Sequence, residues 1–188
     1  MRPKRVFEGE TLRRRTTLRQ IRVRARAGRA TQGWLAAGHL RLPVALGSSG
    51  IRANKREGDG ATPRGSFRLV RLWWRRDRAC RPRTLLPVRR IGEADAWCEN
   101  PSDRRYNRPT RLAADAAGDR LWRDDHLYDF LVELDHNARP RVAGRGSAVF
   151  LHLARPGFRP TAGCVALAPE SFRRLLVRLG PGTRIVIG

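Results

Sequence analysis

The sequence predicts a mostly β domain with one main helix near the C-terminus and a long irregular insertion. Apolar and polar side chains alternate in several short segments, which is typical of strands with one buried face. One segment, which begins at Pro169, instead carries apolar side chains at helical spacing. The 188 residues are enough for one domain with a core and too few for two ordinary domains.

The N-terminal part of the sequence divides near residue 18. Residues 1–17 are basic and poor in apolar side chains, so we interpret them as a basic N-terminal arm. In residues 18–25 apolar and basic side chains alternate, which predicts the first strand of a single domain over residues 18–188. Further strands are predicted at residues 33–36, 40–46, 66–74, 127–134, 148–153 and 183–187.

Two loops and one helix complete the prediction. Residues 47–65 are rich in glycine and predict a loop. Residues 75–123 contain many Pro, Arg and Asp and show weak periodicity, so we expect a long insertion with little regular structure, a kind of loop that is often functional. The helix begins at Pro169 and stops at Gly180, and its apolar face consists of Phe172, Leu175, Leu176 and Leu179.

The formal net charge of +23 is the most prominent feature of the composition, and it comes almost entirely from arginine. Both a solvated basic surface and affinity for a polyanion (nucleic acid, a membrane surface or an anionic wall polymer) agree with this charge. The sequence lacks a helix-turn-helix, zinc-finger or RNA-recognition signature. We therefore expect no specific nucleic-acid partner, and a non-enzymatic nucleic-acid-binding protein is an alternative that rests on charge alone. No apolar stretch approaches the ~18 residues that cross a bilayer, so no transmembrane segment is expected.

The three cysteines, Cys80, Cys98 and Cys164, form no Cys-x-x-Cys pair. One disulfide between Cys80 and Cys98 would leave Cys164 free, and two unrelated buried thiols at the first two positions are an equally open alternative. The histidines outside the motif described below also lack the spacing of metal ligands. We expect no metal site and no cofactor.

The segment with the clearest chemical signal contains His152 on a predicted strand, followed by the turn Thr161-Ala-Gly-Cys164. A thiol is a weak nucleophile until it loses its proton, and a nearby imidazole can accept that proton or stabilise the thiolate. This pairing predicts a cysteine-dependent acyl-transfer enzyme with Cys164 and His152 as its catalytic residues.

Three segments of the sequence resemble those of one known family, in the right order. They are Gly58-Asp-Gly-Ala-Thr-Pro-Arg-Gly-Ser-Phe67, the turn Thr161-Ala-Gly-Cys164 with His152 upstream, and Pro181-Gly-Thr-Arg-Ile-Val-Ile187. Together they are similar to the YkuD-type L,D-transpeptidase catalytic domain, from about Leu40 to the end of the chain.

The resemblance implies an L,D-transpeptidase-like β-sandwich that acts on peptidoglycan stem peptides. It assigns Cys164 as the nucleophile that forms a thioester and His152 as its base, with backbone N–H groups around Gly163 to hold the oxyanion. The implied partners are stem peptides and, as an acylating inhibitor, a carbapenem. The implied substrate places the protein in the periplasm or cell envelope. Because no apolar core of roughly 7–15 residues follows the basic N-terminus, we expect no standard secretory signal in this sequence.

The sequence departs from the family pattern beside the nucleophile. Ala162 stands where histidine is common, Ala166 where arginine or asparagine is common, and only eleven residues separate His152 from Cys164. These departures favour a divergent branch that makes a 1→3 rather than a 3→3 cross-link. Hydrolysis by an L,D-carboxypeptidase or amidase with the same two residues stays open. We expect substrate contacts from Thr161, Arg155, Arg104, Tyr106 and Asn107, because arginine binds carboxylates in a bidentate way and the other side chains supply polar groups.

Overall fold

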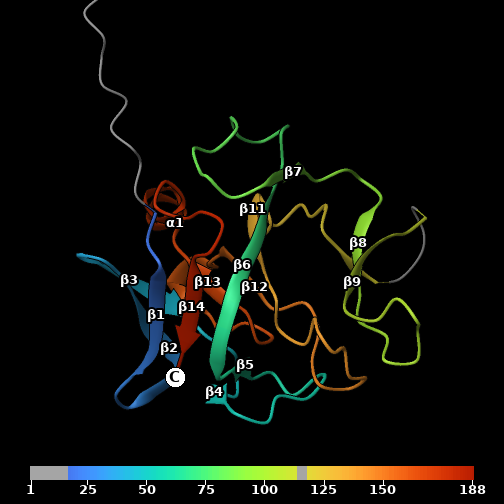
Figure 1. The fold of residues 1–188 in the computed structure, drawn as a ribbon, viewed down its shortest axis with the longest axis horizontal. Helices are drawn as coiled ribbons and strands as arrows, with labels where there is room; N and C mark the ends of the chain where they lie inside the picture. The colour runs from blue at the N-terminus through green and yellow to red at the C-terminus, as the bar shows by residue number, and fades with distance from the viewer. Residues whose placement is uncertain (1–16, 114–117) are drawn as a thin grey trace, which may run out of the picture.

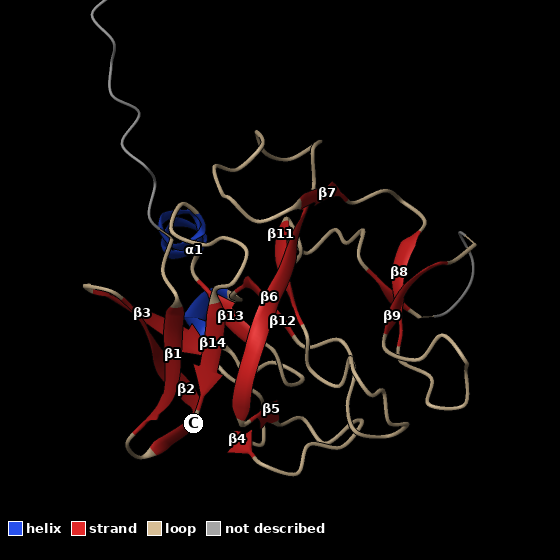
Figure 2. Ribbon diagram, in the orientation of Figure 1, coloured by secondary structure: helices blue, strands red, loops and turns tan. Residues whose placement is uncertain are grey.

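Figure 1 shows a computed structural model of the chain, in which residues 17–113 and 118–188 are described. The predicted basic arm, residues 1–17, lies outside the described part except for its last residue. The described residues form many strands and one α-helix, which confirms the predicted mostly β class (Figure 2). Within these residues, no helix is long and apolar enough to span a bilayer.

The main strands follow the alternating segments of the sequence. They are β1 (Gln20–Arg26), β2 (Arg29–Ala37), β3 (Leu40–Ala45), β6 (Gly65–Trp74), β11 (Phe130–Leu134), β12 (Phe150–Leu153), β13 (Val165–Leu167) and β14 (Arg184–Ile187). Shorter strands are β4 (Ile51–Arg52), β5 (Thr62–Pro63), β7 (Val88–Arg90), β8 (Asp95–Cys98), β9 (Arg108–Arg111) and β10 (Asp119–Arg120). Of the main strands, β13 is absent from the sequence prediction because three residues are too few to show a period.

The main sheet closes on itself. Among the described residues it has nine strands in the order β11-β12-β13-β3-β2-β1-β14-β6-β7, and β11 pairs in addition with β6. The closure depends on the length of β6, which has ten residues. Residues 65–68 of β6 pair with β14, and residues 69–74 pair with β11. The sheet therefore wraps around its own interior, which holds the core.

Apolar side chains from all eight strands of this closed circuit and from the α-helix form one buried cluster. The helix α1 (Pro169–Leu176) covers one end of the sheet and buries Phe172, Leu175 and Leu176. It begins at Pro169 as predicted and ends before Leu179, which is nevertheless fully buried. The predicted apolar face is therefore used for packing even where the helix has ended.

The insertion contains more regular structure than its sequence predicts. Strands β10, β8 and β9 form a separate three-stranded sheet, which stands apart from α1 on the other side of the main sheet (Figures 1 and 2). Its strands have two to four residues, so they show no recognisable period. Trp97 and Leu121 anchor this part of the chain in a second buried cluster, against Trp73, Leu131 and Phe150 on the outer face of the main sheet. Burial of these apolar side chains, rather than strand periodicity, gives the insertion its structure.

Asn107 is the polar link between the insertion and the segment that precedes β12. Its Oδ1 accepts hydrogen bonds from Trp97 Nε1 at 3.1 Å and from the Ala148 N–H at 3.2 Å. Its Nδ2 donates to the main-chain carbonyls of His136 and Asn137. Buried polar groups that lose their partners are costly, so this amide fixes Ala148 as well as the insertion.

Replacing Asn107 by alanine is therefore expected to destabilise the fold. The change leaves buried donors and acceptors unpaired, each of which costs about 1–3 kcal/mol. Urea unfolding of N107A should show a loss of at least this size, whereas Asn100→Ala, which removes an exposed amide bonded to the Ser102 N–H, should stay within about 0.5 kcal/mol of the wild type. Equal stability of N107A and the wild type would contradict this role.

Candidate active site

The parallel pairing of β12 with β13 sets the positions of both predicted catalytic residues. Its register joins His152 to Ala166, and Cys164 comes directly before β13, beside Phe150. Because side chains alternate across a strand, Phe150 and His152 point to the same face of β12. Phe150 packs with Cys164 in the outer buried cluster, so the imidazole and the thiol lie on the same outer face of the sheet.

The thiol of Cys164 is buried and held by two main-chain groups. The residue is 8% exposed, its Sγ–H donates to the Ala148 carbonyl at 3.2 Å, and Sγ accepts from the Phe150 N–H at 3.4 Å. Burial raises the pKa of the Cys164 thiol to about 12. In the resting site the nucleophile is therefore a neutral thiol that needs a base.

His152 is buried as a neutral imidazole, which can act as the base for the thiol. Its Nδ1 lies 2.8 Å from the Leu153 carbonyl oxygen, which can only accept, so Nδ1 carries the proton and donates it. Burial lowers the pKa of His152 to about 4, so the imidazole is neutral at neutral pH. The remaining nitrogen, Nε2, then has a free lone pair and can accept a proton.

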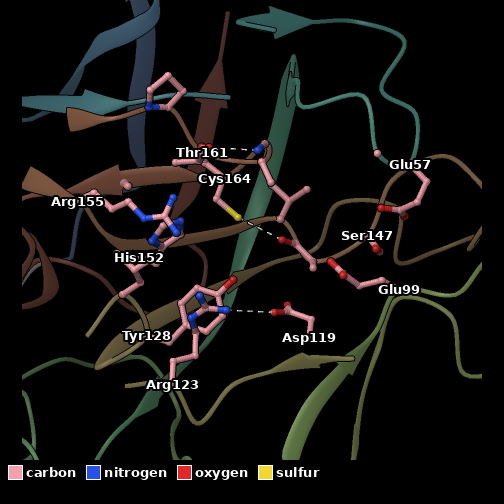
Figure 3. Close-up of a pocket in the computed structure, with 18 of the residues that line it drawn as sticks. Glu57, Glu99, Asp119, Arg123, Tyr128, Ser147, His152, Arg155, Thr161 and Cys164 are labelled. Carbon is pink, nitrogen blue, oxygen red and sulfur yellow. Dashed lines mark hydrogen bonds and ion pairs between the residues drawn. The ribbon is translucent and has the colours of Figure 1, made fainter. Parts of the chain in front are cut away.

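His152 and Cys164 both line one cavity of ≈ 340 Å³ (Figure 3). Charged side chains of both signs surround it. The cations are Lys55, Arg123, Arg155 and Arg159. The carboxylates are Glu57, Glu99 and Asp119. In Figure 3, Arg155 and His152 lie on one side of the sulfur, whereas Glu57, Glu99 and Ser147 lie on the other. Arg155 and Arg159 thus form a basic wall, and Glu57, Glu99 and Asp119 form an acidic wall. Two cations lie on the acidic side: Arg123 is 3.9 Å from Asp119, and the charge of Lys55 acts on Glu99.

The turn before Cys164 has a conformation that requires glycine. Gly163 has φ +138°, and a Cβ at this position would lie 2.7 Å from the Ala61 carbonyl oxygen. Thr161 fixes the turn, because its Oγ1 donates to the Cys164 carbonyl at 2.7 Å and accepts the Gly163 N–H at 3.1 Å. Thr161 lines the cavity, but its hydroxyl is engaged within the turn.

The other predicted substrate residues divide into two groups. Arg155 lines the cavity beside His152 and forms no ion pair within the part of the chain that the structure describes. Arg104, Tyr106 and Asn107 do not line the cavity. Arg104 is exposed between β8 and β9, and Asn107 is used inside the fold. The Tyr106 hydroxyl donates to Glu57 Oε2 at 2.5 Å, so Tyr106 supports a lining residue from behind.

Sequence reasoning missed several lining residues. Lys55 is 6% exposed, forms a 2.5 Å ion pair with Asp59, and its Nζ would lie 3.4 Å from a Cβ at Gly163. The only sequence signal was the rarity of lysine in an arginine-rich chain, where it occurs at Lys4 and Lys55 alone. Other polar lining residues that were missed, and that carry no local motif, are Glu57, Glu99, Asp119, Arg123, Tyr128, Ser147 and Arg159.

Comparison with known proteins identifies the family of the chain. A family model described as the L,D-transpeptidase catalytic domain, YkuD, matches residues 22–187. The chain belongs to this family. The match begins before Leu40, so β1 and β2 are part of the family domain.

One solved structure that is similar to this YkuD chain is an L,D-transpeptidase from Mycobacterium smegmatis. The sequence identity is 14% and the TM-score is 0.42, with 89% of this chain and 58% of the other covered. The chain thus spans less than two thirds of the length of that relative. No protein of curated function matches the sequence.

The departures of this YkuD chain from the family pattern lie directly at the cavity. Ala162 and Ala166 both contribute to its wall, so small apolar side chains stand next to the nucleophile. The other two cysteines take no part. Cys80 and Cys98 are both free, which excludes the disulfide alternative, and Cys80 is exposed rather than buried.

The pH dependence of alkylation tests the neutral state of the thiol. Below its pKa the thiolate fraction grows tenfold per pH unit, so the rate of Cys164 modification by iodoacetamide should rise without a plateau from pH 7 to 10. Peptide mapping in a Cys80→Ser background isolates this site. In the urea-unfolded control the rate should level off above a pKa near ~8.5. A plateau below pH 8 in the folded protein would show a resting thiolate and contradict this assignment.

Proposed function

We propose that the protein is a cysteine-dependent acyltransferase that forms L,D cross-links between peptidoglycan stem peptides through a Cys164 thioester. The observation that carries the proposal is the shared cavity of Cys164 and His152, with the imidazole oriented by the Leu153 carbonyl. Membership of the YkuD family supports the substrate class. The family is typically associated with the cell envelope, and the proposed substrate places this protein there too.

The first half-reaction is acylation. The Sγ–H turns from the Ala148 carbonyl and gives its proton to His152 Nε2 while sulfur attacks a stem-peptide carbonyl. His152 then passes this proton to the leaving amine as the C–N bond breaks, which leaves the acyl group on sulfur as a thioester. Because both groups are neutral at rest, the charged pair exists only during the reaction, when the developing oxyanion is also present.

The main chain around the nucleophile can stabilise that oxyanion. The Gly163 N–H is already donated to Thr161 Oγ1, so the Cys164 N–H is the donor that we assign to this task. Lys55 adds a fixed positive charge next to the turn, and its charge lowers the pKa of Cys164 against the larger effect of burial. Both groups would favour negative charge on the reacting atoms.

The second half-reaction transfers the acyl group to an amine of another stem. The acyl group of the Cys164 thioester lies close to Ala162 and Ala166, at positions where the family usually has larger polar side chains. In this chain Arg155 and Arg159 provide the positive charge of the cavity wall instead. We propose that these arginines bind stem carboxylates in a different register, so that the bond formed is 1→3 rather than 3→3.

Cys164→Ser is expected to abolish acylation by a carbapenem and by stem peptides, because a serine hydroxyl is a much weaker acid and nucleophile than a thiol. His152→Ala should slow acylation by about 10²–10⁴-fold. Intact-protein mass spectrometry measures the adduct, and Cys80→Ser is the matched control, since Cys80 is exposed and lies outside the active-site cavity. Undiminished acylation of Cys164→Ser would refute the proposed nucleophile.

Muropeptide analysis decides the bond that is made. Whole sacculi incubated with the purified protein should yield 1→3 cross-linked dimers, identified by tandem mass spectrometry. Dimers of the 3→3 type would refute the proposed register and leave acyl transfer intact. Trimmed monomers alone would show that water is the acceptor, as in a carboxypeptidase or amidase.

A further inference from the structure

The acidic wall of the cavity is built by the insertion. Glu99 directly follows β8, and Asp119 begins β10, where it pairs with Trp97. Residues two apart on a strand share a face, so Glu99, Trp97 and Asp119 point to the same side of this small sheet. Trp97 packs against Phe150 there, and the two carboxylates accordingly face the cavity that contains Cys164.

The negative charges of these two carboxylates are balanced by few hydrogen bonds or ion pairs among the described residues. Asp119 is 13% exposed at its side chain, and its one ion pair with a described residue is a 3.9 Å contact with Arg123. Arg123 is already committed to Asp125 through bonds of 3.0 and 2.6 Å. Glu99 forms no hydrogen bond or ion pair with residues 17–113 or 118–188, whereas the third carboxylate of this wall, Glu57, accepts the Tyr106 hydroxyl.

Because few partners stabilise their charged forms, both Glu99 and Asp119 have raised pKa values. Burial is the main cause that raises the pKa of Glu99 to about 7. The charges of Asp119 and Glu57 raise it further, and the charge of Lys55 lowers it. The residue as a whole is exposed, so only its cavity side is desolvated. Burial also raises the pKa of Asp119 to about 6, against the lowering effect of Arg123. A cation bound between them would offset this desolvation.

A third polar group at this wall has no hydrogen bond of regular geometry. Ser147 is 6% exposed and lines the cavity, and its Oγ forms no such bond within the described part of the chain. Its hydroxyl does lie close enough to the Tyr106 phenol to lower the pKa of Tyr106. Figure 3 places it between Glu57 and Glu99. Ser147 directly precedes Ala148, whose carbonyl accepts the thiol proton. A buried hydroxyl without a partner is costly, which points to a ligand that supplies one.

We propose that Glu99, Asp119 and Ser147 form a subsite for the primary ammonium group of the acyl acceptor. This inference rests on the proposed acyl transfer and assigns its second half-reaction to particular residues. An ammonium group has three N–H donors and no acceptor, and the subsite offers three acceptor groups, two carboxylates and one hydroxyl. The basic wall with Arg155 and Arg159 repels the same group, so the cavity orients an amine that approaches the thioester.

The subsite also has a chemical role in aminolysis. The bound ammonium gives one proton to the Glu99 carboxylate and becomes a neutral amine. This amine attacks the thioester carbonyl carbon; the C–N bond forms, the C–S bond breaks, and the second amine proton returns to sulfur through His152. Glu99 then releases its proton to solvent. A carboxyl group whose proton affinity is raised accepts the proton of an amine more readily than an ordinary one does.

The test separates transfer from acylation. The double variant Glu99→Gln with Asp119→Asn should acylate Cys164 with a muropeptide donor at least as fast as the wild type, measured by intact-protein mass, because the charges of Glu99 and Asp119 raise the pKa of Cys164. Its transfer to the ammonium-bearing muropeptide acceptor should fall about tenfold or more, since bonds to a charged group are lost. Transfer to hydroxylamine, which is neutral at the assay pH, should be unchanged. Ser147→Ala should reduce muropeptide transfer in the same direction by a smaller factor.

Glu93→Gln is the matched control, because it removes an exposed carboxylate of the same insertion that does not line the cavity. The double variant should unfold at pH 8 at the same temperature as the wild type or higher, because it loses two desolvated charges. Muropeptide transfer at the wild-type level, or equal losses with both acceptors, would overturn the subsite. Failure of the wild-type protein to acylate Cys164 would instead contradict the proposed function itself.

Discussion

The parallel register between β12 and β13 is the constraint on which the site depends. It places Cys164 next to Phe150 and sets His152 two residues further along the same face. A parallel pair needs a crossover connection, and here only eleven residues, including the short helix η1 (Pro156–Phe158), separate the two catalytic side chains. The short interval is therefore compatible with a shared face.

The insertion then converts that face into a cavity. Trp97 packs edge-on against Phe150 at 5.0 Å, and Asn107 ties the same segment to Ala148. Ala148 has a φ of +51°, an uncommon value for a residue with a side chain, and its carbonyl holds the thiol proton. The packing of an irregular segment thus determines the resting state of the nucleophile, although this segment lies far from Cys164 in the sequence.

The sequence predicted the site residues that lie in one short segment. It did not predict those that only the fold brings to the cavity. Cys164 and His152 lie in one short stretch whose glycine and strand pattern are visible without a fold. Glu99 and Asp119 come from strands too short to show a period, so nothing in the sequence indicates that they face the cavity. Asn107 illustrates the opposite error: a polar residue in a loop looks the same whether it faces a substrate or bonds to Trp97 inside the fold. Tertiary burial, which separates these cases, is not encoded in any single segment.

The electrostatics of the cavity show a desolvation cost that a ligand with charges of both signs would reduce. The pKa values of Glu99, Asp119 and Cys164 are all raised, so the fold favours their protonated forms. The unfolded chain releases these protons at lower pH, and the two carboxyl groups therefore reduce the free energy of unfolding as the pH rises from about 4 through 7. On the other wall, Arg155 and Arg159 stand without carboxylate partners among the described residues. A stem peptide carries carboxylates and an amine, and its binding would satisfy both walls, so a site that destabilises the free protein is suited to that class of substrate.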